Sequence, residues 1–192
     1  MTRTFIAVNL SETARAALRR TLRRVGSALP GVRLVNPDDL HLTLAFLGEI
    51  DDATLAAVVT LTQEAARETS PFTLNLGKLG IFGPPYAPRV VWAGVGGDLR
   101  RLGALQQRLA ESLETLGFPR ESRPYAPHLT LARIYRPLAA TPLAQLTAML
   151  AETPRRPAHW PVSEIRVMRS DLNAKGARYT ALSVAPFSQP GA

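Results

Sequence analysis

The pentapeptide His-Leu-Thr-Leu-Ala occupies residues 41–45 and recurs unchanged at residues 128–132. The chain has 192 residues and three histidines, so two of its histidines lie in identical local sequence. A histidine followed two positions later by a threonine arises often by chance, whereas an identical five-residue segment around both does not. The repeat therefore predicts that the two segments have related roles in one structure.

Each pentapeptide is typical of a β-strand with one buried face. Side chains on a strand alternate between its two faces, so His41 shares a face with Thr43, and the leucines beside them point the other way. The same alternation places His128 with Thr130. We expect the leucines to enter the core and each histidine to face a common cleft with its threonine.

Two histidines beside two hydroxyl groups suit the cleavage of a phosphodiester. A neutral imidazole can accept a proton from water while a protonated one supplies a proton to the leaving oxygen. Threonine hydroxyls can donate to the phosphate oxygens on which charge develops. Arg133 directly follows the second pentapeptide. Ideal alternation turns it away from His128, but it reaches a phosphate if the strand ends or bulges there.

Hydrophobic periodicity and turn residues around the two segments predict mixed strands and helices. Strands are expected at residues 4–10, 32–35, 40–47, 72–82, 89–95, 128–134, 162–168 and 178–184. Helices are expected at residues 12–29, 51–68, 98–116 and 143–151, the first with Ser11 as its N-cap. Gly48 is expected to end the strand of the first pentapeptide. No linker divides the sequence, so we expect one α+β domain over residues 1–192, with two related lobes around a shared cleft.

The composition bears on partners and on location. The formal net charge is +8, and arginine supplies nearly all of the basic residues because only two are lysine. This charge favours a polyanionic partner, although a general bias towards arginine explains it equally well. Cysteine is absent, which excludes disulfides and thiolate sites and fits a reducing compartment. No apolar run approaches the roughly 18 residues of a membrane span, so we expect a soluble, cytoplasmic monomer.

The third histidine and the acidic residues give weaker patterns. His159 has no threonine two residues later and is expected in a loop or at a strand edge. A metal site built from His41, His128 and a carboxylate such as Glu49 or Asp171 is an alternative. The histidines lack the spacing of the zinc-binding His-Glu-x-x-His segment, so we expect no metal and no cofactor.

With these residues in view, the chain resembles the 2H phosphoesterase superfamily, which is defined by two His-x-Thr/Ser motifs. More narrowly, it is similar to the RNA 2′,3′-cyclic phosphodiesterases, first described as 2′-5′ RNA ligases. The likeness covers nearly the whole chain. Besides the pentapeptides, it rests on residues 3–7, 37–40, 46–48, 88–89, 92–95, Pro127, Arg133, Ser170, Gly176 and Tyr179. The chain departs from the family at Leu34, where tryptophan is frequent, and at Ala45, where lysine is frequent.

The resemblance implies a bilobal, LigT-like fold of mainly antiparallel sheets flanked by helices, with the active site in the central cleft. It implies hydrolysis of a 2′,3′-cyclic phosphate at an RNA 3′ end to a 2′-phosphomonoester without metal. His41 would be the proton donor and His128 the proton acceptor, and Thr43, Thr130 and Arg133 would bind the phosphate. The partner would be an RNA end, with tRNA fragments and cyclic nucleotides both open. Two alternatives are a 2′-5′ ligase or 2′-5′ phosphodiesterase, and a non-catalytic protein that binds RNA ends.

Overall fold

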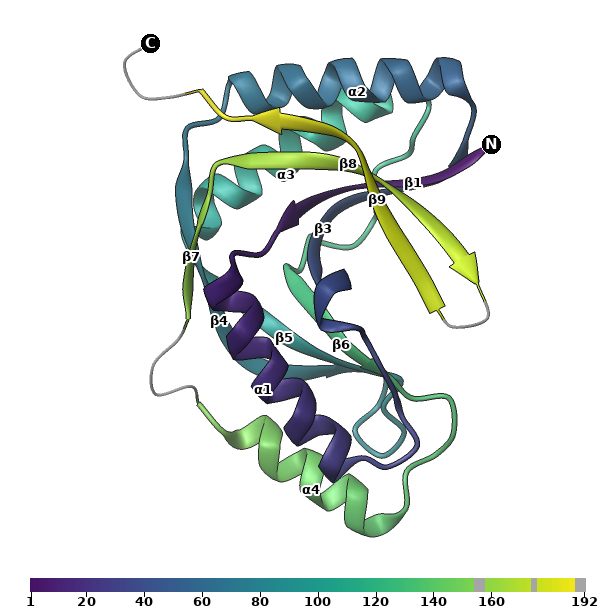
Figure 1. Cartoon of the computed structure of the whole chain (residues 1–192), viewed down its shortest axis with the longest axis vertical. Coiled ribbons are helices and arrows are strands. Elements are labelled where there is room, and N and C mark those ends of the chain that lie inside the picture. Colours follow the sequence, from purple (N-terminus) through teal and green to yellow (C-terminus); the bar gives the residue numbers. More distant parts are fainter. Residues whose placement is uncertain (154–157, 174–175, 189–192) are drawn as a thin grey trace.

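The computed structural model describes residues 1–153, 158–173 and 176–188, whose strands form two antiparallel sheets (Figure 1). One sheet has the order β3-β1-β8-β9 and the other the order β2-β6-β5-β4-β7. The strands are β1 (Thr2–Asn9), β2 (Arg33–Leu34), β3 (His41–Ile50), β4 (Phe72–Phe82), β5 (Val90–Gly97), β6 (His128–Arg133), β7 (His159–Val162), β8 (Glu164–Asn173) and β9 (Gly176–Pro186). The helices are α1 (Glu12–Ala28), the 3-10 turn η1 (Pro37–Asp39), α2 (Asp52–Arg67), α3 (Leu99–Glu114) and α4 (Ala140–Ala151).

The two histidine strands occupy matching places in the two sheets. β3 pairs with β1, which pairs with β8, and β6 pairs with β5, which pairs with β4. The short strand β2 adds to the free side of β6. The expected α+β class, with two related lobes of antiparallel sheet, is therefore confirmed.

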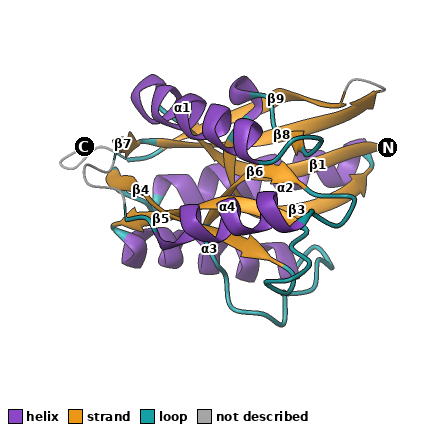
Figure 2. Cartoon of the chain, turned by 90° about the horizontal axis from the view of Figure 1, so that it is seen from below, coloured by secondary structure: helices purple, strands orange, loops and turns teal. Residues whose placement is uncertain are grey.

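Helices α1 and α3 each cover the sheet opposite to the strand that precedes them, whereas α2 packs on β8 and β9 of the sheet that contains its preceding strand. α1 follows β1 but packs against β6, β7 and α4, whereas α3 follows β5 but packs against β3 and α2. In Figure 1, α2 and α3 accordingly lie at one end of the molecule and α1 and α4 at the other, and Figure 2 shows α4 in front of the strands. This exchange ties the two lobes together. None of the described helices combines the length and apolarity that a membrane crossing requires.

The leucines of the two pentapeptides meet in one core. Leu42, Leu44, Leu129 and Leu131 are all buried and belong to the same cluster. The buried face of α3, including Leu105, joins this cluster. Burial of a leucine side chain contributes about 1.5–3 kcal/mol, so the leucines that alternate with the histidines and threonines hold the two sheets together.

One expectation about strands is wrong, and one strand was not expected. Gly48 does not end its strand, because β3 continues to Ile50. Gly48 has a φ of 72° next to a shift in the β1–β3 register, which is the backbone of a bulge rather than of a stop. The sequence pattern also missed β7, which pairs with β4 at the edge of its sheet. Its Pro161 is tolerated there because an edge strand has one row of unpaired donors.

Two glycines offer opposite tests of the packing. A Cβ at Gly80 would lie 2.2 Å from Cη2 of Trp92, whereas a Cβ at Gly103 in α3 would meet nothing within 4 Å. We expect Gly80→Ala to lower the free energy of unfolding by about 1–3 kcal/mol through overpacking. Gly103→Ala should raise it by about 0.5–1 kcal/mol, because glycine is a poor helix former. Urea unfolding followed by circular dichroism measures both changes, and equal denaturation midpoints for the two variants would contradict this packing.

Candidate active site

A cleft of about 1330 Å³ lies between the two sheets. All five residues that the sequence singles out line it: His41 and Thr43 from β3, and His128, Thr130 and Arg133 from β6. The remaining walls include residues of β1, α1, β2, η1, the β8–β9 hairpin and the start of β5. The structure thus brings together, in one cleft, two segments that are far apart in the sequence.

A β-bulge occurs at the same place in both pentapeptides. In β3, Thr43 pairs with Ala7 but Ala45 pairs with Ile6, so Leu44 is an inserted residue. In β6, one inserted residue, Leu131, likewise separates two paired positions, at Thr130 and Ala132. Such a bulge places two successive residues against one partner residue and shifts the alternation of all residues beyond it.

The bulges bring the sixth residue of each segment to the cleft. Phe46 follows the first pentapeptide and Arg133 the second, and both line the cleft. Strict alternation, which would turn Arg133 away from His128 and Thr130, is therefore wrong for this strand. The two histidine units are alike in backbone but differ at this position, where one carries an aromatic ring and the other a cation.

Both imidazoles are fixed by a backbone hydrogen bond at Nδ1. The Nδ1 of His41 lies 2.7 Å from the carbonyl oxygen of Asp39, and that of His128 lies 2.8 Å from the carbonyl oxygen of Ala126. A carbonyl oxygen only accepts, so in each ring Nδ1 carries the hydrogen and donates it. Nε2 is then the nitrogen of each ring that is available to exchange a proton.

The surroundings of the two rings differ. The ring of His41 packs against those of Phe5 and Tyr179, with centroid distances of 4.6 and 4.9 Å, and these two rings also contact each other at 5.2 Å. His128 contacts Phe82 edge to face at 4.8 Å, with Trp92 further away at 6.2 Å. Burial lowers the pKa of His41 from its ordinary value of 6.5, and the hydrogen bond to Asp39 partly opposes this.

Arginines from both sheets line the cleft together with Tyr179. Burial raises the pKa of Tyr179, the Asp39 carboxylate raises it further, and Arg133 and Arg3 lower it. Arg3 belongs to β1 and also lies over the ring of Phe46, 4.9 Å from its centroid. A phosphate in this part of the cleft would therefore meet guanidinium groups from each lobe.

Tyr125 joins the two histidine units. It lies in the segment before β6, and its hydroxyl donates to the carbonyl oxygen of Thr43 in β3 at 2.9 Å. Burial raises its pKa, so it stays a protonated donor. No local sequence pattern indicates such a bond, because its partners are far apart in the chain. Tyr179 formed part of the family resemblance, but its contact with His41 was equally invisible in sequence.

The other candidate residues lie elsewhere. His159 is exposed in the edge strand β7, and neither Glu49 nor Asp171 lines the cleft. Among the described residues, no group of three or more histidine or carboxylate side chains is arranged to hold a metal ion.

Comparison with known proteins places this chain in a family. The family model of the 2′-5′ RNA ligase superfamily matches residues 12–174. The chain is 33% identical to an RNA 2′,3′-cyclic phosphodiesterase of Methanothermobacter thermautotrophicus, over 95% of this chain and 97% of that protein. It is also 33% identical to one of Geobacillus stearothermophilus, of whose length it spans only 56%.

Solved structures agree with the sequence comparison. A crystal structure of a Thermus thermophilus protein superposes with a TM-score of 0.82 at 32% identity, covering 96% of this chain and 97% of that one. E. coli LigT complexed with 3′-AMP gives a TM-score of 0.78 at 29% identity, covering 98% and 99%. The chain belongs to the 2′-5′ RNA ligase superfamily. The proteins to which it is similar include RNA 2′,3′-cyclic phosphodiesterases and E. coli LigT.

The burial of His41 gives a prediction for its titration. Followed by NMR, His41 should titrate below 6.5, because its charged form is poorly solvated where the ring is buried against Phe5 and Tyr179. Tyr179→Ala should raise this midpoint by opening the ring to water. Tyr86→Ala, at an exposed position outside the cleft, should leave it unchanged. A His41 midpoint above 6.5 in the wild type would contradict the assigned environment.

Proposed function

We propose that this protein hydrolyses the 2′,3′-cyclic phosphate at RNA 3′ ends to a 2′-phosphomonoester without a metal ion. The observation that carries the proposal is the presence in one cleft of two His-x-Thr units, one from each sheet. Relatives named RNA 2′,3′-cyclic phosphodiesterase that match nearly the whole chain support the same reaction.

In this reaction the two histidines divide the proton transfers. Nε2 of His128 accepts a proton from water as the water oxygen bonds to phosphorus. The bond between phosphorus and the 3′ oxygen breaks, and Nε2 of His41 gives its proton to that oxygen. The 2′ oxygen stays bonded, so the product is a 2′-phosphomonoester with a free 3′ hydroxyl. The assignment of His41 as the acid and His128 as the base follows the family resemblance. Both rings make the same backbone hydrogen bond, so that bond by itself assigns neither role.

The role of His41 as an acid has an electrostatic requirement. Burial lowers its pKa and so favours the neutral ring in the free protein. The cyclic phosphate carries one negative charge, and an anion next to an imidazole favours the protonated form. Binding of the substrate therefore counteracts the effect of burial and prepares the acid where it is used.

Thr43, Thr130 and Arg133 hold the phosphate in this proposal. The two hydroxyls donate to the non-bridging oxygens, where charge accumulates in the transition state, and the guanidinium group of Arg133 neutralises that charge. Arg3, from the other sheet, lines the same cleft. Donors that are already in place need no reorganisation during the reaction.

The name of the family model makes 2′-5′ ligation a second candidate. A 5′ hydroxyl in place of water would attack the same phosphorus, and the same bond to the 3′ oxygen would break. The product would be a 2′-5′ linkage formed with the same acid and base. Chromatography of the products with and without a 5′-hydroxyl acceptor separates ligation from hydrolysis.

The histidines give the direct test of hydrolysis. On an oligoribonucleotide ending in a 2′,3′-cyclic phosphate, His41→Ala and His128→Ala should each lower kcat by about 10²–10⁴-fold. EDTA should not change the wild-type rate, and the product should carry a 2′-phosphate. His159→Ala, in an exposed edge strand, is the matched control and should retain the wild-type rate. An inactive wild type that still binds the RNA end would instead favour the non-catalytic alternative.

The threonine hydroxyls can be tested with conservative pairs. Thr43→Val and Thr130→Val keep the size of the side chain but lose the donor, and each should lower kcat by about 10²–10³-fold. Thr43→Ser and Thr130→Ser keep a hydroxyl and should recover most of the rate. If the valine variants were as active as the serine variants, the hydroxyls would have no part in stabilising the transition state.

A further inference from the structure

The two carbonyl oxygens that hold the imidazoles lie in segments with little hydrogen bonding of their own. Asp39 ends the 3-10 turn η1 just before β3, and Ala126 lies just before β6, in a segment over residues 118–127 that forms neither helix nor strand. A 3-10 turn has poorer hydrogen-bond geometry than an α-helix. Within the described part of the chain, residues 119–126 make no backbone–backbone hydrogen bond. Local backbone pairing therefore does little to fix either oxygen.

Arg15 of α1 holds the turn that carries the first of these oxygens. Its Nη1 donates to the carbonyl oxygens of Pro37 at 2.8 Å and of Asp38 at 2.9 Å. The side chain is only 15% exposed, and a hydrogen bond from a guanidinium group is stronger than one between neutral groups. Asp38 directly precedes Asp39, whose carbonyl oxygen accepts from Nδ1 of His41. Arg15 thus fixes the peptide units next to the acceptor.

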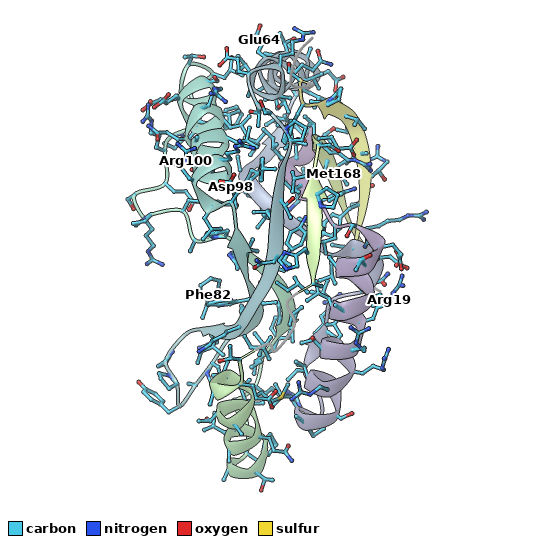
Figure 3. All side chains as sticks on the ribbon, turned by 90° about the vertical axis from the view of Figure 1, so that its left-hand side faces the viewer. Arg19, Glu64, Phe82, Asp98, Arg100 and Met168 are labelled. Carbon is cyan, nitrogen blue, oxygen red and sulfur yellow. The ribbon has the colours of Figure 1, made fainter. Side chains whose placement is uncertain are left out.

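The same contact crosses between the lobes. α1 packs against β6 and β7 of one sheet, whereas η1 leads into β3 of the other. Arg19, which lies one turn further along α1 (Figure 3), pairs with the Asp38 carboxylate at 2.9 Å. Both of these side chains are more exposed than that of Arg15, and exposed ion pairs contribute little. Arg15 is therefore the main contact between α1 and η1.

Tyr125 holds the second oxygen in a comparable way. It directly precedes Ala126, whose carbonyl oxygen accepts from Nδ1 of His128. The Tyr125 hydroxyl donates to the carbonyl oxygen of Thr43 at 2.9 Å, and its ring packs against the main core cluster. Thr43 belongs to β3 in the other sheet. The peptide that orients His128 is thus fixed relative to the strand of the first histidine.

These two interlobe hydrogen bonds occupy equivalent positions in the repeat. Asp38 and Tyr125 each lie three residues before a histidine and directly before the residue that accepts from its Nδ1. The chemical solutions differ, because a guanidinium group donates into one segment and a phenol donates out of the other. Neither Arg15 nor Tyr125 lines the cleft. Any effect they have on the reaction must therefore pass through other residues.

We infer that Arg15 and Tyr125 are positioning residues, which hold His41 and His128 respectively with the hydrogen on Nδ1 and with Nε2 directed into the shared cleft. The hydrogen bond at one ring nitrogen sets which nitrogen carries the hydrogen. A displacement of about 1 Å in a reacting group can cost about a hundredfold in rate. The inference rests on the proposed function for its effect on rate, whereas its claim about the rings holds without turnover.

The first test is kinetic. Arg15→Met and Tyr125→Phe remove the donor and keep most of the side chain. On an oligoribonucleotide ending in a 2′,3′-cyclic phosphate, each should lower kcat by about 10–100-fold and leave KM within about threefold of wild type, since neither residue lines the cleft. Arg15→Lys keeps a cationic donor and should lose less of kcat than Arg15→Met.

The second test follows the rings themselves. Nitrogen NMR of the imidazoles, at a pH where both rings are neutral, shows which ring nitrogen carries the hydrogen. Arg15→Met should increase the Nε2-protonated form of His41 and leave His128 as in the wild type. Tyr125→Phe should do the reverse. A general loosening of the fold would change both rings alike, so this selectivity separates positioning from stability.

The controls remove matched groups elsewhere. Arg24→Met changes another arginine of α1, which pairs with Glu152 at 2.6 Å and does not line the cleft. Tyr86→Phe removes a hydroxyl from a ring that is 78% exposed. Both controls should retain the wild-type kcat and the wild-type state of both rings.

Two outcomes would overturn the inference: no change of kcat in either variant, or a loss of kcat while both rings keep the hydrogen on Nδ1. A wild type inactive on the cyclic phosphate would instead overturn the proposed function. The NMR comparison would then still decide whether Arg15 and Tyr125 orient the two imidazoles.

Discussion

The packing of four leucines against one another and against α3 is the interaction on which the site depends. Leu42, Leu44, Leu129 and Leu131 alternate with the histidines and threonines and are buried in one cluster. The two strands come from different sheets, so the apolar contact of their inner faces sets how their outer faces lie around the cleft. The hydrogen bond from Tyr125 to the Thr43 carbonyl adds a polar link between the same segments. The repeated pentapeptide thus supplies both the leucines that pack the two lobes together and the histidines and threonines that line the cleft.

The two His-x-Thr units, one in β3 and one in β6, have similar backbone conformations but different surroundings. Both histidines donate from Nδ1 to a carbonyl two residues earlier, and both strands bulge at the fourth residue of the pentapeptide. The first unit then presents Phe46 beside a buried imidazole, and the second presents Arg133. An acid and a base need different environments although they are built from the same residue type. One such difference is the packing of His41 against Phe5 and Tyr179, since burial lowers the pKa of His41. The negative charge of the bound substrate counteracts this lowering of the pKa.

The sequence predicted the helices within a few residues, and it predicted the histidine strands and their alternation, because these follow from local periodicity. It also named the five residues that the cleft brings together. It did not predict that β3 continues beyond Gly48, because a glycine with positive φ ends some strands and bulges others. The bulge at Leu131, the contact of Tyr179 with His41 and the hydrogen bonds of Arg15 to η1 were likewise beyond its reach. Each depends on strand register or on contacts between distant segments, which a single sequence does not state.

The central claim is that one imidazole from each sheet acts on the same phosphate, one as a base and the other as an acid. The pH dependence of kcat/KM on an oligoribonucleotide with a 2′,3′-cyclic phosphate end tests it most directly. We predict a bell-shaped profile for the wild type. The residual activity of His128→Ala should lack the fall at low pH, and that of His41→Ala should lack the fall at high pH. A wild-type rate that rises steadily with pH, as in attack by hydroxide alone, would contradict paired acid–base catalysis in this cleft.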